Sequence, residues 1–183
     1  MALDNVLIAE IITLLNTGFV TLNNLVPVPP IIQQSYQPVQ QGANTPPTIY
    51  LFKVSDNRLG FPYRNNAWNA ETETEVFQTI QQYETTFQAN CWATQDPANT
   101  ASLTASDLAN YAAYIIQSDS TVTALEANGW GIYRVSQVRN PSFTDDRDRF
   151  EFAPSFDFTI THKQIITLTS PIITETVLQV LEV

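Results

Sequence analysis

Two side chains that could support nucleophilic catalysis occur once each in this chain, Cys91 and His162. A thiol becomes a strong nucleophile when a neighbouring imidazole takes its proton. However, Cys91 falls on the apolar side of an alternating stretch, where cysteine usually acts as a small hydrophobic residue. His162 closes a second alternating stretch, where packing or hydrogen bonding is the simpler role. We therefore expect no enzyme activity, and a cysteine hydrolase stays only as a minor alternative.

A second chemical possibility is a metal site in the acidic run near residue 148. Calcium binds clusters of carboxylates, and its loops need a glycine for the sharp turn. Here two arginines interleave the acids, and the glycine is absent. The residues concerned are Asp145, Asp146, Arg147, Asp148, Arg149 and Glu151. We expect a charged hairpin turn or an ion-pair patch rather than a metal site, and one histidine with one cysteine cannot form a zinc centre.

Three glutamates alternate just before a predicted strand, at Glu71, Glu73 and Glu75. A pair of carboxylates does acid–base work only when the two environments differ, so that one is protonated and the other is ionised. Three equivalent carboxylates on one edge offer no such difference. They predict a negative surface stripe. With five glycines in the whole chain and no glycine-rich phosphate loop, we also expect no nucleotide cofactor.

Three large aromatic residues, Phe61, Tyr63 and Trp68, lie close together in the polar stretch 56–74. Tyrosine and tryptophan are enriched at interfaces, so the stretch is a candidate binding loop. The other interpretation is a loop that folds back over the sheet and completes the core. Both stay open, and a soluble module that binds a glycan or a protein through this loop is our alternative function.

The bulk composition narrows the classes of partner. The 183 residues fit one domain with terminal extensions, and 44% hydrophobic residues are enough for a core. The net charge is −10, which disfavours binding to phosphates or to an anionic membrane. Only 14% of residues are charged, a surface suited to extensive protein contacts. The apolar start of the chain contains Asp4 and Glu10 and lacks a basic region, so we expect neither a signal peptide nor a membrane span, and synthesis in the cytosol.

Hydrophobic periodicity predicts the first half of the fold. A helix is expected over residues 4–17, with Asp4 as N-cap and Gly18 as its stop. The proline- and glutamine-rich segment that follows predicts an extended connection rather than a core element. A strand over 48–55, the polar loop over 56–74 and a long strand over 76–92 come next.

The second half predicts a helix and a hairpin. The helix begins near residue 104, presents Leu108, Ala112, Ile115 and Ile116 on one side, and closes at Gly129. Strands over 130–139 and 150–162 should pair across a charged turn. In the second of these strands an apolar residue occupies alternate positions, which are Phe150, Phe152, Phe156, Phe158 and Ile160. Pro154 predicts a bulge or edge position, because proline cannot donate to a ladder.

Together these elements predict an α+β fold, with a mixed or antiparallel sheet and helices packed on one face. The expected order is α-β-β-α-β-β with extended terminal arms. We divide the chain into an N-terminal helix and Pro/Gln-rich segment at 1–45, an α+β domain at 46–166, and a C-terminal arm or added strand at 167–183.

The order of three segments resembles a known family. TTFQANCWA at 85–93, ASDLANYAAYIIQS at 105–118 and FAPSFDFTITHKQ at 152–164 follow one another as strand, helix and final strand. In this order they resemble the neck or tail-terminator (tail-completion) proteins of tailed bacteriophages, especially the contractile-tailed group. The resemblance covers roughly residues 46–166 and rests on pattern and order.

The resemblance implies a structural protein of the virion with no active site. Such a protein would form a homohexameric ring that caps the tail tube and joins it to the head connector, with tube or sheath protein on the other side. DNA would pass through the lumen without specific binding, and assembly would take place in the cytoplasm of the bacterial host. A neighbouring connector or tube role stays open beside the terminator role.

Our candidate interface residues come from the aromatic loop, the acidic stripe, the charged turn and the C-terminal segment. They are Phe61, Tyr63, Trp68, Glu71, Glu73, Asp145, Arg147, Arg149, Ile172, Ile173, Val177 and Leu178.

Overall fold

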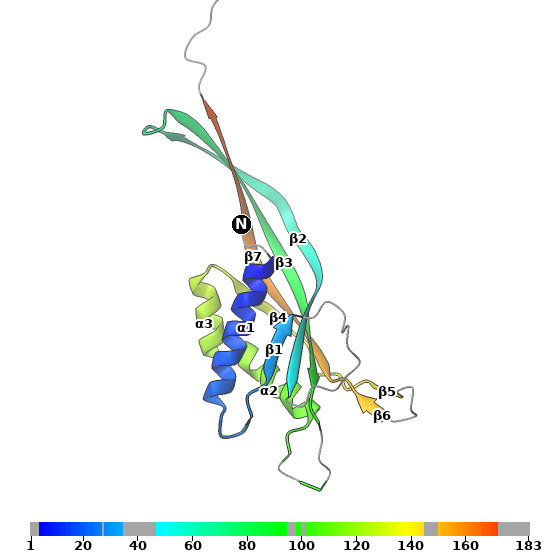
Figure 1. Cartoon of the computed structure of the whole chain (residues 1–183). Helices are drawn as coiled ribbons and strands as arrows, with labels where there is room; N and C mark the ends of the chain where they lie inside the picture. Colours follow the sequence, from blue (N-terminus) through cyan, green and yellow to red (C-terminus); the bar gives the residue numbers. More distant parts are fainter. Residues whose placement is uncertain are drawn as a thin grey trace, which may run out of the picture.

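The fold is seen in a computed structural model that describes residues 4–26, 28–34, 47–94, 98–99, 102–144 and 150–171 (Figure 1). The elements in chain order are α1 (Asp4–Thr21), β1 (Ile31–Gln34), β2 (Thr48–Asn69), β3 (Thr74–Trp92), α2 (Ala105–Gln117), α3 (Asp119–Ala127), β4 (Gly131–Val135), β5 (Ser142–Thr144), β6 (Phe150–Phe152) and β7 (Ser155–Pro171).

The main sheet has five strands in the order β1-β2-β3-β7-β4. β1 is parallel to β2, and the other neighbours are antiparallel. β5 and β6 form a separate two-stranded sheet. The α+β class and the mixed sheet are confirmed. The expected element order differs from the observed one, because β1, α3 and β5 are additional elements and the last strand is divided into β6 and β7.

The core lies between one face of the sheet and the helices α1 and α2. Residues directly opposite in an antiparallel pair share a face, and the pairs Phe87 with Phe158 and Ala89 with Phe156 are all buried. Their partners from the helices include Leu7, Leu15, Leu108, Ala112 and Ile116. The predicted alternation in the last strand is confirmed at Phe156, Phe158 and Ile160, which are at most 1% exposed.

The predicted stop of the first helix at Gly18 is wrong, because α1 continues to Thr21. Gly18 instead lies directly against Ile115 of α2. A Cβ atom at this position would come within 2.3 Å of Ile115 Cγ2. The residue is therefore a glycine because the two helices leave no space for a side chain.

The predicted second helix is two helices that meet at Ser118. Thr104 caps α2 in a capping box with Asp107, in which each side chain bonds the other's backbone N–H. Ser118 ends α2 with extended backbone, and its hydroxyl accepts a hydrogen bond from the N–H of Thr121 in α3. Gly129, with φ of +72°, follows α3 and leads into β4.

The expectation that the Pro/Gln-rich segment is only a connection is wrong for residues 31–34. These residues form β1, which pairs in parallel with residues 48–51 of β2. The N–H of Ile31 also donates to the carbonyl of Pro47 at 2.8 Å. Pro29 and Pro30 come directly before β1, and proline favours extended backbone in the residue that precedes it.

The predicted loop over 56–74 is also wrong, because one strand, β2, extends from Thr48 to Asn69. It pairs with β3 as far as Asn69 opposite Thr74, and the turn covers only residues 70–73. In that turn Asn69 Oδ1 accepts a hydrogen bond from the N–H of Glu71 at 3.0 Å. Ladder pairing thus continues through residues whose side chains show no apolar alternation.

The predicted final hairpin is confirmed: β4 pairs with β7, with Ile132 opposite Ile160 and Val135 opposite Phe158. Pro154 lies between β6 and β7, and its carbonyl accepts a hydrogen bond from the N–H of Cys91 at 2.9 Å.

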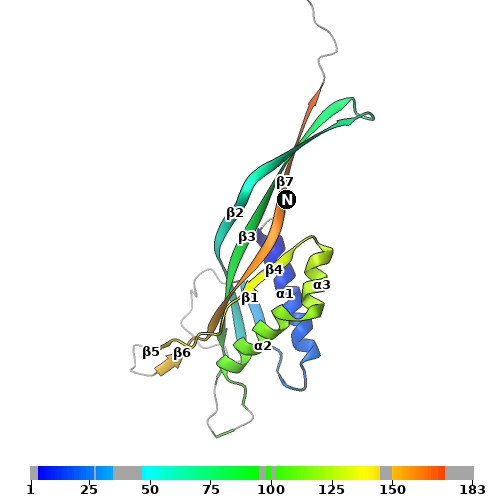
Figure 2. The same ribbon diagram turned by 180° about the vertical axis from the view of Figure 1, so that it is seen from behind.

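The helices cover only one part of the sheet. In Figure 1 and, from behind, in Figure 2, β2, β3 and β7 continue well beyond α1, α2 and α3 as a narrow three-stranded extension. We call it the distal ribbon and define it as residues 57–69 of β2, 74–84 of β3 and 161–171 of β7. At about 3.3 Å per residue, its β7 strand is about 33 Å long.

Candidate interaction surface

The distal ribbon has no hydrophobic core of its own. Among its described side chains, His162 alone is buried. The exposed apolar side chains are Phe61 (99%), Tyr63 (64%), Trp68 (51%), Ile165 (44%), Ile166 (50%) and Leu168 (65%). A sheet of a few β-strands without a packed face is only marginally stable in water. The ribbon therefore keeps six large apolar side chains exposed on a part of the sheet that is not packed against the helices.

Strand register assigns these side chains to two faces. The helix-side face, which continues the face that packs on α1 and α2, carries Trp68, Phe77, Ile166 and Leu168. The opposite face carries Tyr63, Val76, Ile80 and Ile165. Antiparallel sheets in water commonly keep one face apolar and the other polar. A ribbon that is apolar on both faces is suited to contact protein on both.

A bulge interrupts the ribbon at residues 60–62, which lie between the pairs Leu59–Gln82 and Tyr63–Ile80. Gly60 has φ of +64°, a conformation that glycine adopts without strain. The side-chain amide of Gln81 donates to the carbonyl of Leu59 at 2.9 Å and supports the bulge. Phe61 is almost fully exposed at this point. The sequence Gly60-Phe61-Pro62 inside a strand is typical of a bulge, a signal that our prediction of a loop overlooked.

A polar cluster lies where the helix-covered sheet meets the ribbon. Lys53 Nζ forms ion pairs with Asp4 Oδ1 at 2.7 Å, from the start of α1, and with Asp56 Oδ2 at 2.5 Å. Both carboxylates are partly exposed, so each pair adds little to stability. Asp56 also accepts a hydrogen bond from Thr85 Oγ1 at 2.7 Å. Its pKa is lowered, because the bonds from Lys53 and Thr85 outweigh the opposing effect of burial.

His162 completes this cluster from β7. Its Nε2 lies 2.8 Å from Thr85 Oγ1. Since the one hydroxyl proton of Thr85 goes to Asp56, Nε2 must donate, and the imidazole is the Nε2–H form. The ring stacks on Tyr83 with 5.8 Å between centroids. Burial lowers the pKa of His162, while Asp56 opposes that shift. The hydrogen-bonding and packing role that we expected for His162 is confirmed.

The structure separates the two residues that could have formed a nucleophile pair. Cys91 and Tyr83 are eight positions apart on β3, and His162 lies opposite Tyr83. At about 3.3 Å per residue this places Cys91 about 26 Å from His162. Burial raises the pKa of the Cys91 thiol to about 12, so it stays protonated and unreactive at neutral pH. The hypothesis of a Cys91–His162 hydrolase is wrong.

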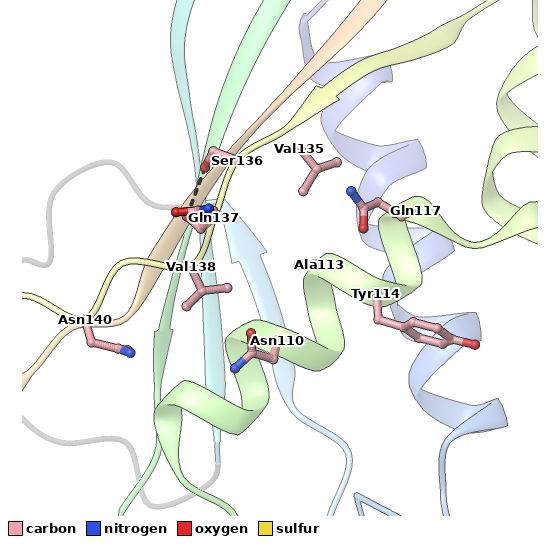
Figure 3. A pocket seen from close by; sticks show the side chains of 9 residues that line it. All are labelled: Asn110, Ala113, Tyr114, Gln117, Val135, Ser136, Gln137, Val138 and Asn140. Atoms are coloured by element: carbon pink, nitrogen blue, oxygen red, sulfur yellow. Dashed lines mark hydrogen bonds between the residues drawn. The ribbon is translucent and has the colours of Figure 1, made fainter.

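An open pocket of about 440 Å³ lies between α2 and the segment after β4 (Figure 3). Its polar lining comes from amides, one phenol and one serine hydroxyl, and none of its lining side chains is a carboxylate or an amine. The lining residues are Asn110, Ala113, Tyr114, Gln117, Val135, Ser136, Gln137, Val138 and Asn140. This lining supplies hydrogen-bond donors and acceptors to a contacting chain and no acid–base pair.

The structure locates five of the predicted interface residues. Phe61, Tyr63 and Trp68 are exposed in the distal ribbon, which excludes the alternative that they complete the core. Glu71 and Glu73 are exposed in the turn at its tip. The remaining candidates lie outside the described residues; they are Asp145, Arg147, Arg149, Ile172, Ile173, Val177 and Leu178. Our list omitted Ile165, Ile166 and Leu168, which are exposed as well. Their run of β-branched and apolar types is compatible with either a core strand or an arm.

Neither a metal site nor a membrane-spanning helix is found among the described residues. No group of three or more His, Cys, Asp or Glu side chains gathers there in a way that could hold a metal ion. Residues 145–149 of the calcium-like acidic run lie outside them. No helix in the described ranges has the length and apolar character needed to cross a membrane.

Comparison with known proteins assigns the chain to a family. No curated protein matches it. A sequence profile of the family described as E217 gateway protein gp29 matches residues 5–172. This match begins in α1, ends just after β7 and includes the whole sheet, the three helices and the distal ribbon. The chain therefore belongs to the E217 gateway protein gp29 family, a phage head–tail gateway or neck family.

Proposed function

We propose that this phage neck protein forms a homohexameric ring that caps the tail tube and joins it to the head connector. The observation that carries the proposal is the distal ribbon, a three-stranded extension with exposed apolar side chains on both faces. Exposing such a surface to water costs free energy, and contact with other protein offsets this cost. A ring subunit has neighbours on two sides and partners at two ends, which matches this demand.

The charge of the chain supports the same role. Only 14% of residues are charged, so desolvating the surface at contacts costs little. The net charge of −10 repels the phosphates of DNA, as suits a channel through which DNA passes without specific binding. On this proposal the protein acts in the neck of the virion, after assembly in the cytoplasm of the host, and contacts tube or sheath protein on one side and connector on the other.

The candidate interface residues divide into two sets on this proposal. Phe61, Tyr63, Trp68, Glu71 and Glu73 provide contacts along the ribbon and at its tip. Asp145, Arg147 and Arg149 and the apolar residues of 172–178 provide a second set, which stays a prediction. Deleting residues 172–183 tests the apolar part of the second set: assembly should be lost while the circular dichroism of the domain is unchanged.

The ring is tested by mass in solution, using light scattering over a wide concentration range. Six copies of a 20.5 kDa chain give about 123 kDa. Ile166→Lys together with Leu168→Lys should reduce the mass to that of the monomer, because the ribbon would then carry unpaired charge into a contact. Thr123→Lys, exposed on α3, is the matched control and should keep the ring. A wild-type chain that stays monomeric and does not bind isolated tails contradicts the proposal.

A soluble binding module remains a second candidate because three aromatic side chains are exposed along one strand, Phe61, Tyr63 and Trp68. Trp68→Ala separates the two functions. A ring component should lose oligomer mass or tail binding. A binding module should keep its mass and lose affinity for a glycan or protein ligand.

A further inference from the structure

We propose that neighbouring copies of this chain join edge to edge through the distal ribbon. In this contact, residues 165–169 of β7 in one copy pair as parallel strands with residues 63–67 of β2 in the next. The inference rests on the proposed ring and specifies the joint between its subunits.

The first observation is that both outer edges of the ribbon lack a neighbouring strand within the described chain. β4 pairs with β7 only between Val135 opposite Phe158 and Gly131 opposite Thr161. β1 pairs with β2 only from Thr48 to Leu51. Beyond these limits, at residues 165–169 of β7 and 63–67 of β2, each edge presents backbone N–H and C=O groups that another strand can pair with.

The second observation is that the β7 edge lacks the usual protection. Natural edge strands avoid pairing by means of charges, prolines or bulges. Residues 165–169, with the sequence IITLT, contain no charge and no proline, and β7 pairs with β3 without a register shift. On β2, the bulge at 60–62 and the turn at 70–73 bound the regular segment 63–69. The two regular edges therefore face outwards at the same end of the molecule.

The strand register shows that the two edges lie at the same position along the length of the ribbon. Tyr63, Ile80 and Ile165 occupy one row across the three strands, and Ala67, Val76 and Thr169 occupy another. β2 and β7 are both antiparallel to β3, so they run in the same direction. A copy related by rotation about an axis along the ribbon therefore offers its β7 edge parallel to β2.

This pairing uses two different edges, so it is heterologous and repeats from copy to copy until a ring closes. It would place Ile165 of one copy beside Tyr63 of the next on the opposite face, which extends the apolar row across the joint. With three strands from each of six copies, the wall would contain about 18 strands, a size at which β-barrels leave an aqueous channel.

Disulfide trapping tests the pairing. Asn65→Cys and Thr167→Cys introduce thiols in the same row, on exposed positions of the two edges. Replacing Thr167→Cys by Ile165→Cys or Thr169→Cys samples the neighbouring registers on the same face. The purified full-length variants are oxidised with glutathione disulfide, and their masses are compared on a denaturing gel with and without reductant. The native Cys91 is buried and should not take part.

The expected result is a ladder of covalent multiples extending beyond the dimer from one of the double variants, abolished by reductant and absent from each single variant. A dimer from Thr167→Cys alone would show β7 pairing with β7 and would overturn the inference. A ring seen by light scattering without a ladder in all three registers overturns the edge pairing and leaves the proposed ring standing. A chain that is monomeric and gives no ladder overturns the edge pairing, and it overturns the ring as well if it does not bind isolated tails.

Discussion

The helix-covered part of the sheet and the distal ribbon share β2, β3 and β7, yet they are stabilised in different ways. In the first part, Phe158 on β7 is 1% exposed and lies against a helix layer. Ten residues further along the same strand, Leu168 is 65% exposed. Both residues are paired with β3 in an unbroken ladder. The comparison shows that strand pairing extends beyond the core and that burial, rather than pairing, distinguishes the two regions.

The largest effect should come from truncating the core end of β7. Phe158→Ala removes a buried ring that contacts Phe87 at 5.6 Å between centroids, and should lower the free energy of unfolding by about 3–5 kcal/mol. Leu168→Ala is the matched variant and should change it by less than about 0.5 kcal/mol in the monomer. Urea denaturation at low protein concentration measures both.

Leu168→Ala should nevertheless weaken assembly, since the side chain lies on the helix-side face of the ribbon. If Leu168→Ala destabilises the monomer as strongly as Phe158→Ala, the distinction between the two regions fails.

Gly18→Ala should produce the next largest effect. In an open helix position this change stabilises by about 1 kcal/mol, because alanine is the better helix former. Against Ile115 the new methyl group overlaps, and we expect a loss of about 1–3 kcal/mol instead. Asn16→Ala, at an exposed position of α1, serves as the control. The sign of the change in thermal or urea unfolding decides whether the helices are as tightly packed as described.

Thr104→Ala should cost about 1 kcal/mol, because it removes the N-cap of α2. The hydroxyl accepts a hydrogen bond from the N–H of Asp107 at 3.1 Å, and the Asp107 carboxylate bonds the N–H of Thr104 in return. Thr104→Ser should restore most of the loss. The substitution lies far from the distal ribbon, so it should not affect assembly. The oligomer mass of the Thr104→Ala variant should therefore equal that of the wild type, although its unfolding free energy is lower.

The smallest effect should be the pH dependence at the junction of the two regions. The folded pKa of His162 lies below its ordinary value of about 6.5, so the unfolded chain binds the proton more readily. The free energy of unfolding should therefore decrease as pH falls through about 6.5 and level off below the folded pKa. Asp56 acts in a separate window, below about pH 4, because its pKa is lowered from 3.8.

Urea unfolding between about pH 7.5 and 5 separates His162 from the carboxylates. His162→Gln should flatten the dependence in this range. A wild-type slope that survives the substitution would assign the dependence to other groups.

The regions predicted well from sequence are those in which burial imposes a period. Phe156, Phe158 and Ile160 alternate because one face of β7 packs on helices, so the strand and its pairing with β4 were recognisable. The distal ribbon was missed in β2 because neither of its faces is buried, and side-chain alternation disappears while the backbone ladder continues. Gly18 was misinterpreted because its neighbour, Ile115, lies far away in the sequence.

The candidate surface was predicted in part, through residue type. Aromatic side chains marked Phe61, Tyr63 and Trp68 as contacts, and all three are exposed. Ile166 and Leu168 were missed, since an apolar, β-branched run without a visible partner strand is compatible with either a core strand or an arm. The exposure of such residues depends on how far the helices extend along the sheet, and the local sequence around the residues does not predict that.

The unbroken ladder between β3 and β7 has a mechanical consequence. All 17 residues of β7 pair with β3, and the ladder bonds lie across the long axis of the ribbon. A pull along this axis loads those bonds side by side, so they must break together, whereas a pull across it peels them one at a time. We expect the extension to be stiff against tension along its length and weak against sideways peeling, with the bulge at 60–62 as the place where β2 separates first.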